Sequence, residues 1–215
     1  MFSPDSVRAK LDYSHFSSAR DNAGYIWLAG IDNEIENRHR HKAGKYFLQD
    51  GMWVMCSKDG AKTWQARKII GRGDYPTIAC AKNGDLLVFS RESKKLTSPG
   101  FGALMMQRSR DNGQTWSKPL KVIDDKVIQT RVYRAPDNRL WLAYVQTDSL
   151  QRRRTSLWLT SSNDDGKTWK KPQRITDGKR LDREPDMIWR DGKLLIVFSR
   201  AGGDINTNIW LAEVG

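Results

Sequence analysis

The chain has 215 residues and a formal net charge of +12 at pH 7, with 38% hydrophobic and 29% charged residues. Its length suits one large all-β domain, and no apolar run reaches the roughly 18 to 20 residues of a membrane-spanning helix. The charge favours an anionic partner such as a nucleic acid, an acidic glycan or a membrane surface, with a merely solubilising surface as the alternative.

The N-terminal segment and the cysteines bear on where the protein works. Residues 1–6 lack the basic and then apolar segments of a secretory signal. This fits either a cytoplasmic protein or one whose leader was removed, so the localisation stays open. Cys56 and Cys80 fall in apolar strand patterns, so two buried thiols are the first expectation and a bridge is the alternative. No Cys or His spacing indicates structural zinc, and no cofactor is expected.

Short apolar runs rich in β-branched and aromatic residues recur along the chain, each after a tight polar turn, which is the pattern of strands and hairpins. They align as the second strand of four successive units at 25–29, 86–90, 140–144 and 194–199. First, inner strands are expected near 15–20, 75–81, 128–134 and 184–189, and third strands at 52–57, 103–109, 155–162 and 207–213. The sequence therefore predicts an all-β fold built from one repeated unit.

One eight-residue phrase recurs at the ends of three predicted third strands. It reads SKDGAKTW at 57–64, SRDNGQTW at 109–116 and SNDDGKTW at 162–169, and its aspartates are 52 and then 53 residues apart. That period is typical of propellers and solenoids. In a tight hairpin the Asp accepts hydrogen bonds from the following amides, Gly supplies a positive φ, and Thr and Trp restart a strand.

The phrase resembles the Asp-box, or bacterial neuraminidase repeat, of the sialidase superfamily. The resemblance implies a β-propeller in which the box joins the third and fourth strands of a blade, on the face opposite the family's active sites. The second and third copies match S-x-D-x-G-x-T-W at every fixed position, whereas the first has Ala61 in place of the glycine and Gly60 before it. We therefore expect a distorted turn in the first copy.

Four strand sets accompany only three boxes, because the fourth unit stops at 208–215, before a fourth strand. Propellers avoid unpaired edges, so residues 6–12 are expected to supply the missing strand beside 207–213. Residues 1–215 then form a single Asp-box β-propeller domain with four blades of four antiparallel strands. Since true sialidases have six blades, the alternative is a fragment or half that completes its ring by association, for example as a homo-oligomer.

Loops expected on the face opposite the boxes carry much of the positive charge. They contain Arg38, His39, Arg40, His41, Lys42 and Lys45 in the first unit, Arg91, Lys94 and Lys95 in the second, Arg152, Arg153 and Arg154 in the third, and Arg200 in the fourth. A field summed at a channel mouth attracts anions, although charged loops are also common as solvated surface. Arg91 and Arg200 either point toward the channel or cap strand ends and pair with Asp residues. His39 and His41 fit exposed positions better than metal or phosphate ligands.

Entrances to the inner strands surround the central channel, where propellers bind their ligands. They carry His15, Arg72, Asp74, Tyr75, Gln129, Arg131, Arg183, Glu184 and Asp186. Arginine binds a carboxylate or sulfate through two parallel charge-assisted hydrogen bonds. The substrate-binding set expected from these positions and the loops is Arg183, Arg131, Arg72, Arg91, Arg200 and Asp186, with no metal.

Two segments resemble sialidase motifs. Residues 183–185 resemble the R-I-P segment, with Glu184 in place of Ile, which implies that Arg183 is a carboxylate-binding arginine. Residues 73–76 resemble the segment of the nucleophilic tyrosine, which implies Tyr75 as nucleophile, Glu184 as the carboxylate that takes its proton and Asp74 as acid/base. Plain packing of a Tyr before Pro is the alternative, and the N-terminal segment lacks the R-I-P motif that the family carries there.

Functions of three classes remain open. The first is a sialidase-like propeller that recognises an anionic carbohydrate through a basic channel, with glycoside hydrolase activity if the Tyr75 set is catalytic. The second is a non-catalytic lectin-like or scaffold propeller. The third, non-specific binding of nucleic acid, draws on charge alone and lacks the exposed aromatic interleaving of single-strand binders. No membrane partner is expected.

Overall fold

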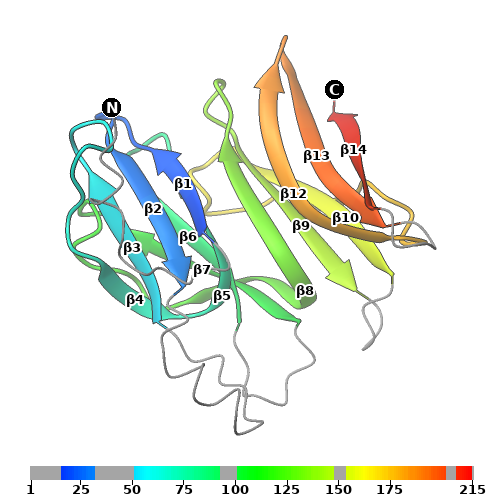
Figure 1. Cartoon of the computed structure of the whole chain (residues 1–215), viewed down its shortest axis with the longest axis horizontal. Helices are drawn as coiled ribbons and strands as arrows, with labels where there is room; N and C mark the ends of the chain where they lie inside the picture. The colour runs from blue at the N-terminus through cyan, green and yellow to red at the C-terminus, as the bar shows by residue number, and fades with distance from the viewer. Residues whose placement is uncertain (1–15, 32–50, 93–100, 148–153, 202–206, 215) are drawn as a thin grey trace, which may run out of the picture.

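The computed structural model describes residues 16–31, 51–92, 101–147, 154–201 and 207–214, and all regular structure in these ranges is β-strand. The strands form three antiparallel sheets arranged side by side (Figure 1). No helix in the described ranges is long and apolar enough to cross a membrane. The all-β fold expected from the sequence is therefore confirmed.

Each predicted strand set appears in the structure. The first sheet contains β1 (Phe16–Arg20), β2 (Ile26–Ile31), β3 (Gly51–Ser57) and β4 (Lys68–Arg72). The second contains β5 (Asp74–Cys80), β6 (Leu86–Arg91), β7 (Gly102–Ser109), β8 (Leu120–Arg134), β9 (Leu140–Thr147), β10 (Thr155–Ser162) and β11 (Gln173–Arg174). The third contains β12 (Leu181–Arg190), β13 (Lys193–Ala201) and β14 (Thr207–Val214).

The long strand β8 joins two of the predicted units into the seven-stranded sheet. Its first part pairs with β7, and from Val127 onward it pairs with β9. Lys126, at φ 63°, lies between the two parts, and the pairing registers shift on both sides. The chain therefore passes from the outer strand of one unit to the inner strand of the next without a loop.

Closure of a ring is not seen in the described residues. β14 pairs with β13 only, and no described strand joins it to β1. On the third sheet, the apolar side chains of Ile188, Ile209 and Leu211 are exposed. The expected closing strand at 6–12 lies outside the described residues.

The sheets pack face to face through apolar side chains that alternate along the strands. Trp27, Met52 and Val54 of the first sheet form one buried cluster with Ile78 and Val88 of the second. A further cluster joins the second and third sheets through residues that include Val145, Leu157, Ile196 and Phe198. Cys56 and Cys80 are buried and unbridged, as expected, and burial raises the pKa of both thiols.

The inner strands β1, β5 and β12 lie at sheet edges and have a strand partner on one side only. The second part of β8 likewise pairs with β9 alone. Side chains of the preceding inner strand bind to the unpaired edge. Ser17 Oγ accepts the Ile78 N–H (2.8 Å), and Thr77 Oγ1 accepts the Val132 N–H (3.2 Å). Gln129 Oε1 accepts the Glu184 N–H (2.9 Å). Buried backbone donors are thus satisfied across the gaps between units.

The three repeated phrases form the same hydrogen-bonded turn. In the second copy, Asp111 Oδ1 accepts the Thr115 N–H (2.8 Å), and Ser109 Oγ accepts the Gly113 N–H (2.8 Å). The Thr115 hydroxyl donates to Asp111 Oδ2 (2.5 Å). Corresponding bonds hold the turns of Asp59 and Asp164. These turns and the β1–β2, β5–β6 and β8–β9 hairpins lie at one end of the sheets, the repeat-turn end. The opposite end, where the inner strands begin, is the entrance end.

The expectation of a distorted first turn is wrong. Ala61 adopts φ 70°, close to the 76° of Gly113, and its N–H donates to Ser57 Oγ at 2.9 Å. What distinguishes the copies is packing. A Cβ on Gly113 would lie 2.7 Å from Trp27, and one on Gly166 would lie 3.0 Å from Leu87. The two later turns are therefore pressed against the preceding unit.

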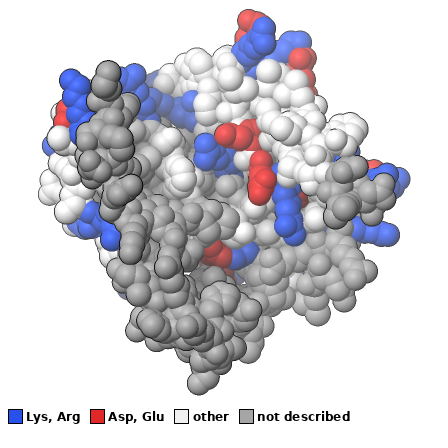
Figure 2. Space-filling view, viewed as in Figure 1, with Lys and Arg blue, Asp and Glu red and all other residues white. Residues whose placement is uncertain are grey.

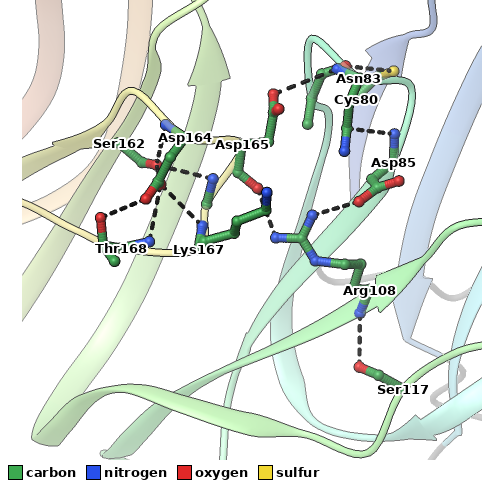
Figure 3. Close-up of polar contacts among 12 residues, drawn as sticks. Cys80, Asn83, Asp85, Arg108, Ser117, Ser162, Asp164, Asp165, Lys167 and Thr168 are labelled. Carbon is green, nitrogen blue, oxygen red and sulfur yellow. Dashed lines mark hydrogen bonds and ion pairs between the residues drawn. The ribbon is translucent and has the colours of Figure 1, made fainter.

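Arg108, which forms an ion pair within the second unit, also binds the third repeat turn (Figure 3). Arg108 Nη1 lies 2.6 Å from Asp85 Oδ2, and both side chains are largely buried. Arg108 Nη2 donates to the Asp165 carbonyl (2.6 Å), while Asp165 Oδ1 accepts the Asn83 N–H (3.4 Å). Arg108 therefore connects two turns that are far apart in the sequence.

Replacing Arg108 with Met should destabilise the protein by about 3 kcal/mol, because the buried Asp85 carboxylate would lose its partner. Urea unfolding measures this change. Arg110→Met is the matched control, since Arg110 is exposed, and it should change stability by no more than about 0.5 kcal/mol. Equal effects of the two substitutions would contradict the assigned role of Arg108.

The turn aspartates should make stability depend on acid pH. The hydroxyl of Thr115 and then its backbone N–H lower the pKa of Asp111 to about 2. The stabilisation by the ionised form is therefore complete above about pH 4 and is lost as the pH falls through about 2. Wild type should exceed Asp111→Asn in urea midpoint at about pH 5, and the two should converge near pH 2. Asp191→Asn, in an exposed hairpin, is the control. A constant difference between wild type and Asp111→Asn would refute the linkage.

Candidate functional site

Two inner strands begin with the same irregularity at the entrance end. Tyr75 and Glu184 both have φ 53°, and each precedes a proline. The pairing register shifts between Asp74 and Thr77 in β5, and between Arg183 and Asp186 in β12. A non-glycine residue at positive φ is strained, and such strain concentrates at functional sites. The two bulges therefore mark the entrance end as the candidate site.

The bulges meet at one cavity of about 210 Å³. Its walls are formed by residues of the four inner strands, β1, β5, β8 and β12. The lining residues are Phe16, Tyr75, Pro76, Gln129, Thr130, Arg131, Glu184 and Pro185. The structure thus brings together Tyr75, Arg131 and Glu184, which were singled out in the sequence. We call this space the upper cavity.

Arg131 and Asp186 form an ion pair across two units beside the upper cavity. Arg131 Nε lies 2.9 Å from Asp186 Oδ1, and Nη2 lies 3.5 Å from Oδ2. The Asp186 side chain is 63% exposed, so the pair is only partly shielded from solvent. Asp186 Oδ1 also accepts the Met187 N–H (2.8 Å). An anionic ligand at Arg131 would therefore compete with an existing carboxylate.

Asp74, expected as an acid/base, lies buried beneath the cavity rather than in its lining. Its carboxylate pairs with the buried Arg91 guanidinium and accepts the Tyr75 N–H (3.0 Å). The Arg91 guanidinium also lies 4.9 Å from the centroid of the Tyr75 ring. Arg91 and Asp74 therefore position the tyrosine from below.

Arg200 forms the corresponding pair in the third sheet. Its Nε and Nη2 bind the two oxygens of the buried Asp182 (2.6 and 3.0 Å). The hydrogen bond to Asp182 raises the pKa of Arg200. Its guanidinium also lies 4.9 Å from the Trp210 ring. For both Arg91 and Arg200, the structure supports pairing with aspartate at strand ends.

Arg183 and Arg72 form no ion pair within the described residues. Arg183 is half-buried, and its Nε is buried without a hydrogen-bond partner there. Arg72 is exposed and is the last residue of the outer strand β4, just before the inner strand β5 begins at Asp74, and it does not line the upper cavity. Among the described arginines of the expected set, Arg183 is thus the one with a buried N–H donor, at Nε, that has no hydrogen-bond acceptor in the described residues.

The surface around this end mixes both charges. Figure 2 shows Lys and Arg beside Asp and Glu near the centre of the viewed face. Of the expected basic loops, Arg154 is described and exposed. His15, Arg38, His39, Arg40, His41, Lys42, Lys45, Lys94, Lys95, Arg152 and Arg153 lie outside the described residues. Within the described ranges, no three His, Cys, Asp or Glu gather as a metal site.

Sequence reasoning missed Phe16, Thr130 and the two prolines of the lining. The sequence did contain one signal for these bulges, because a dipeptide that ends in proline occurs twice, as Tyr75-Pro76 and as Glu184-Pro185. Each pair lies at the start of an inner strand whose partner strand contains Val-Phe-Ser-Arg. A bulge was not visible in the sequence, because it is defined by the register of the partner strand.

Solved structures share the fold at low sequence identity. An uncharacterised protein from Dyadobacter fermentans is 20% identical (TM-score 0.69; 93% of this chain and 65% of that one). A Hadza microbial sialidase is 18% identical (TM-score 0.66; 93% and 44%). An α-L-arabinanase from Penicillium chrysogenum is 14% identical (TM-score 0.67; 94% and 62%). The chain therefore spans less than two thirds of each of these proteins.

Sequence comparison agrees with the fold. No curated protein matches the chain. The family model of the BNR repeat-like domain matches residues 22–199, which include all three repeated turns and both bulges. The chain belongs to the BNR repeat-like domain family, within the sialidase-superfamily fold.

Proposed function

We propose that this chain recognises an acidic carbohydrate at the upper cavity. The observation that carries the proposal is the convergence of Tyr75 and Glu184, from two sheets and at the same strained φ, on one cavity with Arg131 and Gln129. An aromatic face and a few fixed polar groups suit a sugar ring. The similar fold of a sialidase and an arabinanase supports a carbohydrate as the ligand.

Arg183 adjoins Glu184 but is not among the residues that line the upper cavity; it is the proposed partner of the sugar carboxylate at the edge of this site. It begins the same bulge as Glu184, and its Nε is buried without a partner in the described part of the chain. Arg91, Arg131 and Arg200 are each paired with an aspartate. A single carboxylate is therefore better matched to this end than a polyanion, which would need several unpaired cations.

Glycoside hydrolysis is the second candidate, because Tyr75 and Glu184 line the same cavity. In this reaction the Glu184 carboxylate takes the phenol proton while Tyr75 Oη attacks the anomeric carbon and the glycosidic bond breaks. The leaving oxygen needs a proton from an acid. Both Asp74 and Asp186 pair with an arginine, but Asp74 is buried with Arg91 whereas Asp186 is 63% exposed beside Arg131. Asp186 is therefore the proposed acid, because it is the one that a substrate can reach.

The proposed scaffold consists of four consecutive blades within residues 1–215. The seven-stranded sheet supplies two blades that share β8, and the third sheet is a blade with three strands among the described residues. The ring closes either through the strand expected at residues 6–12 or by association with a second copy. A lectin-like protein without turnover uses the same cavity and remains the alternative to the enzyme.

Binding and turnover should separate at Tyr75. Arg183→Ala should weaken binding of a sialoside by about 10- to 100-fold, because a charge-assisted hydrogen bond is lost. Tyr75→Phe should retain binding, and in the enzyme it should abolish release of the sugar. Calorimetry and a hydrolysis assay on the same preparations measure both properties, with Tyr25→Phe as a control away from the cavity.

Sialoside binding that survives Arg183→Ala unchanged would overturn the assigned site. Turnover that persists in Tyr75→Phe would exclude the nucleophile, even if the substrate class were right. Binding without turnover in every form would establish the lectin-like alternative.

Glu184→Gly should make the protein more stable but poorer at binding. Glycine relieves the strain of φ 53°, which should add about 1 kcal/mol in urea unfolding. Asp191, at φ 51° in the β12–β13 hairpin, provides the matched control. Asp191→Gly should stabilise similarly and leave binding unchanged. Loss of stability in Glu184→Gly would show that its side chain makes a structural contact instead.

A further inference from the structure

A second, larger cavity of about 410 Å³ lies at the repeat-turn end. It is bounded by β1, β2, β5 and β8, and β1, β5 and β8 lie side by side in Figure 1. Apolar walls come from Ile26, Ile78 and Val132, and its polar residues include Arg20 and Arg134. Its volume falls in the usual range of about 300 to 1,000 Å³ for small-molecule sites. We call this space the lower cavity.

Corresponding strand ends place the two arginines. Arg20 is the last residue of β1, and Arg134 is the last residue of β8. Each is followed by a hairpin closed by a backbone hydrogen bond, from Asp21 N–H to the Tyr25 carbonyl and from Ala135 N–H to the Arg139 carbonyl. The repeated fold therefore brings two guanidinium groups to the same cavity.

Neutral oxygens orient both guanidinium groups. Arg134 Nη1 donates to Asn22 Oδ1 (2.6 Å) and to the Ala81 carbonyl (3.2 Å). Arg20 Nε donates to the Gly24 carbonyl (3.0 Å). A guanidinium carries five N–H donors, so these bonds fix each group and leave donors over for a ligand.

The charge of the lower cavity is not compensated by its own lining. Its lining residues include no carboxylate, and within the described residues neither Arg20 nor Arg134 forms an ion pair. The neighbouring Asp21 accepts bonds from the Ala23 and Tyr25 amides and from Trp27 Nε1 instead. At the entrance end, by contrast, three arginines have aspartate partners.

We propose that the lower cavity binds a small organic anion. Arg20 and Arg134 bind its carboxylate through charge-assisted hydrogen bonds, and its apolar body packs against Ile26, Ile78 and Val132. The site is separate from the upper cavity and does not depend on the function proposed there. Binding places the anion between the first unit and the next two, so it should also stabilise their packing.

Calorimetry on the whole chain with benzoate as probe tests the proposal. Benzoate should bind saturably, and Arg20→Gln should weaken its binding at least tenfold. Arg190→Gln is the matched control, because Arg190 ends β12 at the same end of the sheets but lies outside the lining. It removes the same charge and should change the affinity less than twofold.

A second variant and a second probe keep the result clear. Arg134→Gln should also weaken benzoate binding at least tenfold. Because Arg134 donates hydrogen bonds to Asn22 and Ala81, the melting temperature of this variant is measured as well, to detect any loss of stability. Benzyl alcohol, which keeps the apolar ring without the charge, should bind at least tenfold more weakly than benzoate.

Absence of saturable benzoate binding would overturn the proposal. An equal loss in Arg190→Gln would do the same, since it would show a general effect of net charge. Arg183→Ala should leave benzoate binding unchanged. Loss there would assign the anion to the upper cavity and refute a separate lower site, whereas failure of sialoside binding alone would leave this site standing.

Discussion

The arrangement of the units depends on one kind of contact: a side chain of each inner strand binds the free edge of the next inner strand. An inner strand has a partner strand on one side only, and its other edge presents N–H groups that need acceptors. Ser17, Thr77 and Gln129 provide these acceptors from one unit to the next. These hydrogen bonds set the spacing and the rotation of each inner strand relative to the next. The apolar clusters farther out then pack against strands whose positions are already fixed.

The inner strands are held in this way along their length, and the repeat-turn end and the entrance end of the sheets differ in chemistry. At the entrance end, strand bulges carry Tyr75 and Glu184 to one cavity, and aspartates neutralise the nearby arginines. At the repeat-turn end, Arg20 and Arg134 close a larger cavity whose lining has no acidic residue. The net charge of the whole chain therefore says little about either end. Local pairing decides which arginines are available to a ligand.

Features that follow from neighbouring residues were predictable from the sequence. Strand positions followed from apolar runs and hairpin turns, and the three equivalent turns followed from the Ser, Asp and Thr of the repeated phrase. The placement of Tyr75 and Glu184 at the starts of inner strands followed from the order of the strands, and in the structure both residues line one cavity.

Features that depend on partners far away in the sequence were not predictable. Asp74 pairs with Arg91 across 17 residues, and Arg131 pairs with Asp186 across 55. Pairing of Arg91 with an Asp was one of two alternatives open from the sequence, but no local pattern identifies Asp74 as its partner or Asp186 as the partner of Arg131. The continuity of β8 was also hidden, because a bend at Lys126 replaces the expected loop. The exposed, outer position of Arg72 depends on where β4 ends, which the apolar pattern does not specify.

The geometry of the turn alone does not explain why the repeated phrase contains glycine. Ala61 shows that the backbone of this turn accepts a methyl group, whereas Gly113 and Gly166 face Trp27 and Leu87 at distances that exclude one. In these two copies the glycine is therefore required by contact with another unit. A motif that demands glycine at this position therefore tests contact between units as well as turn geometry. It passes over the first copy, although the backbone conformation and hydrogen bonds of that turn match those of the other two.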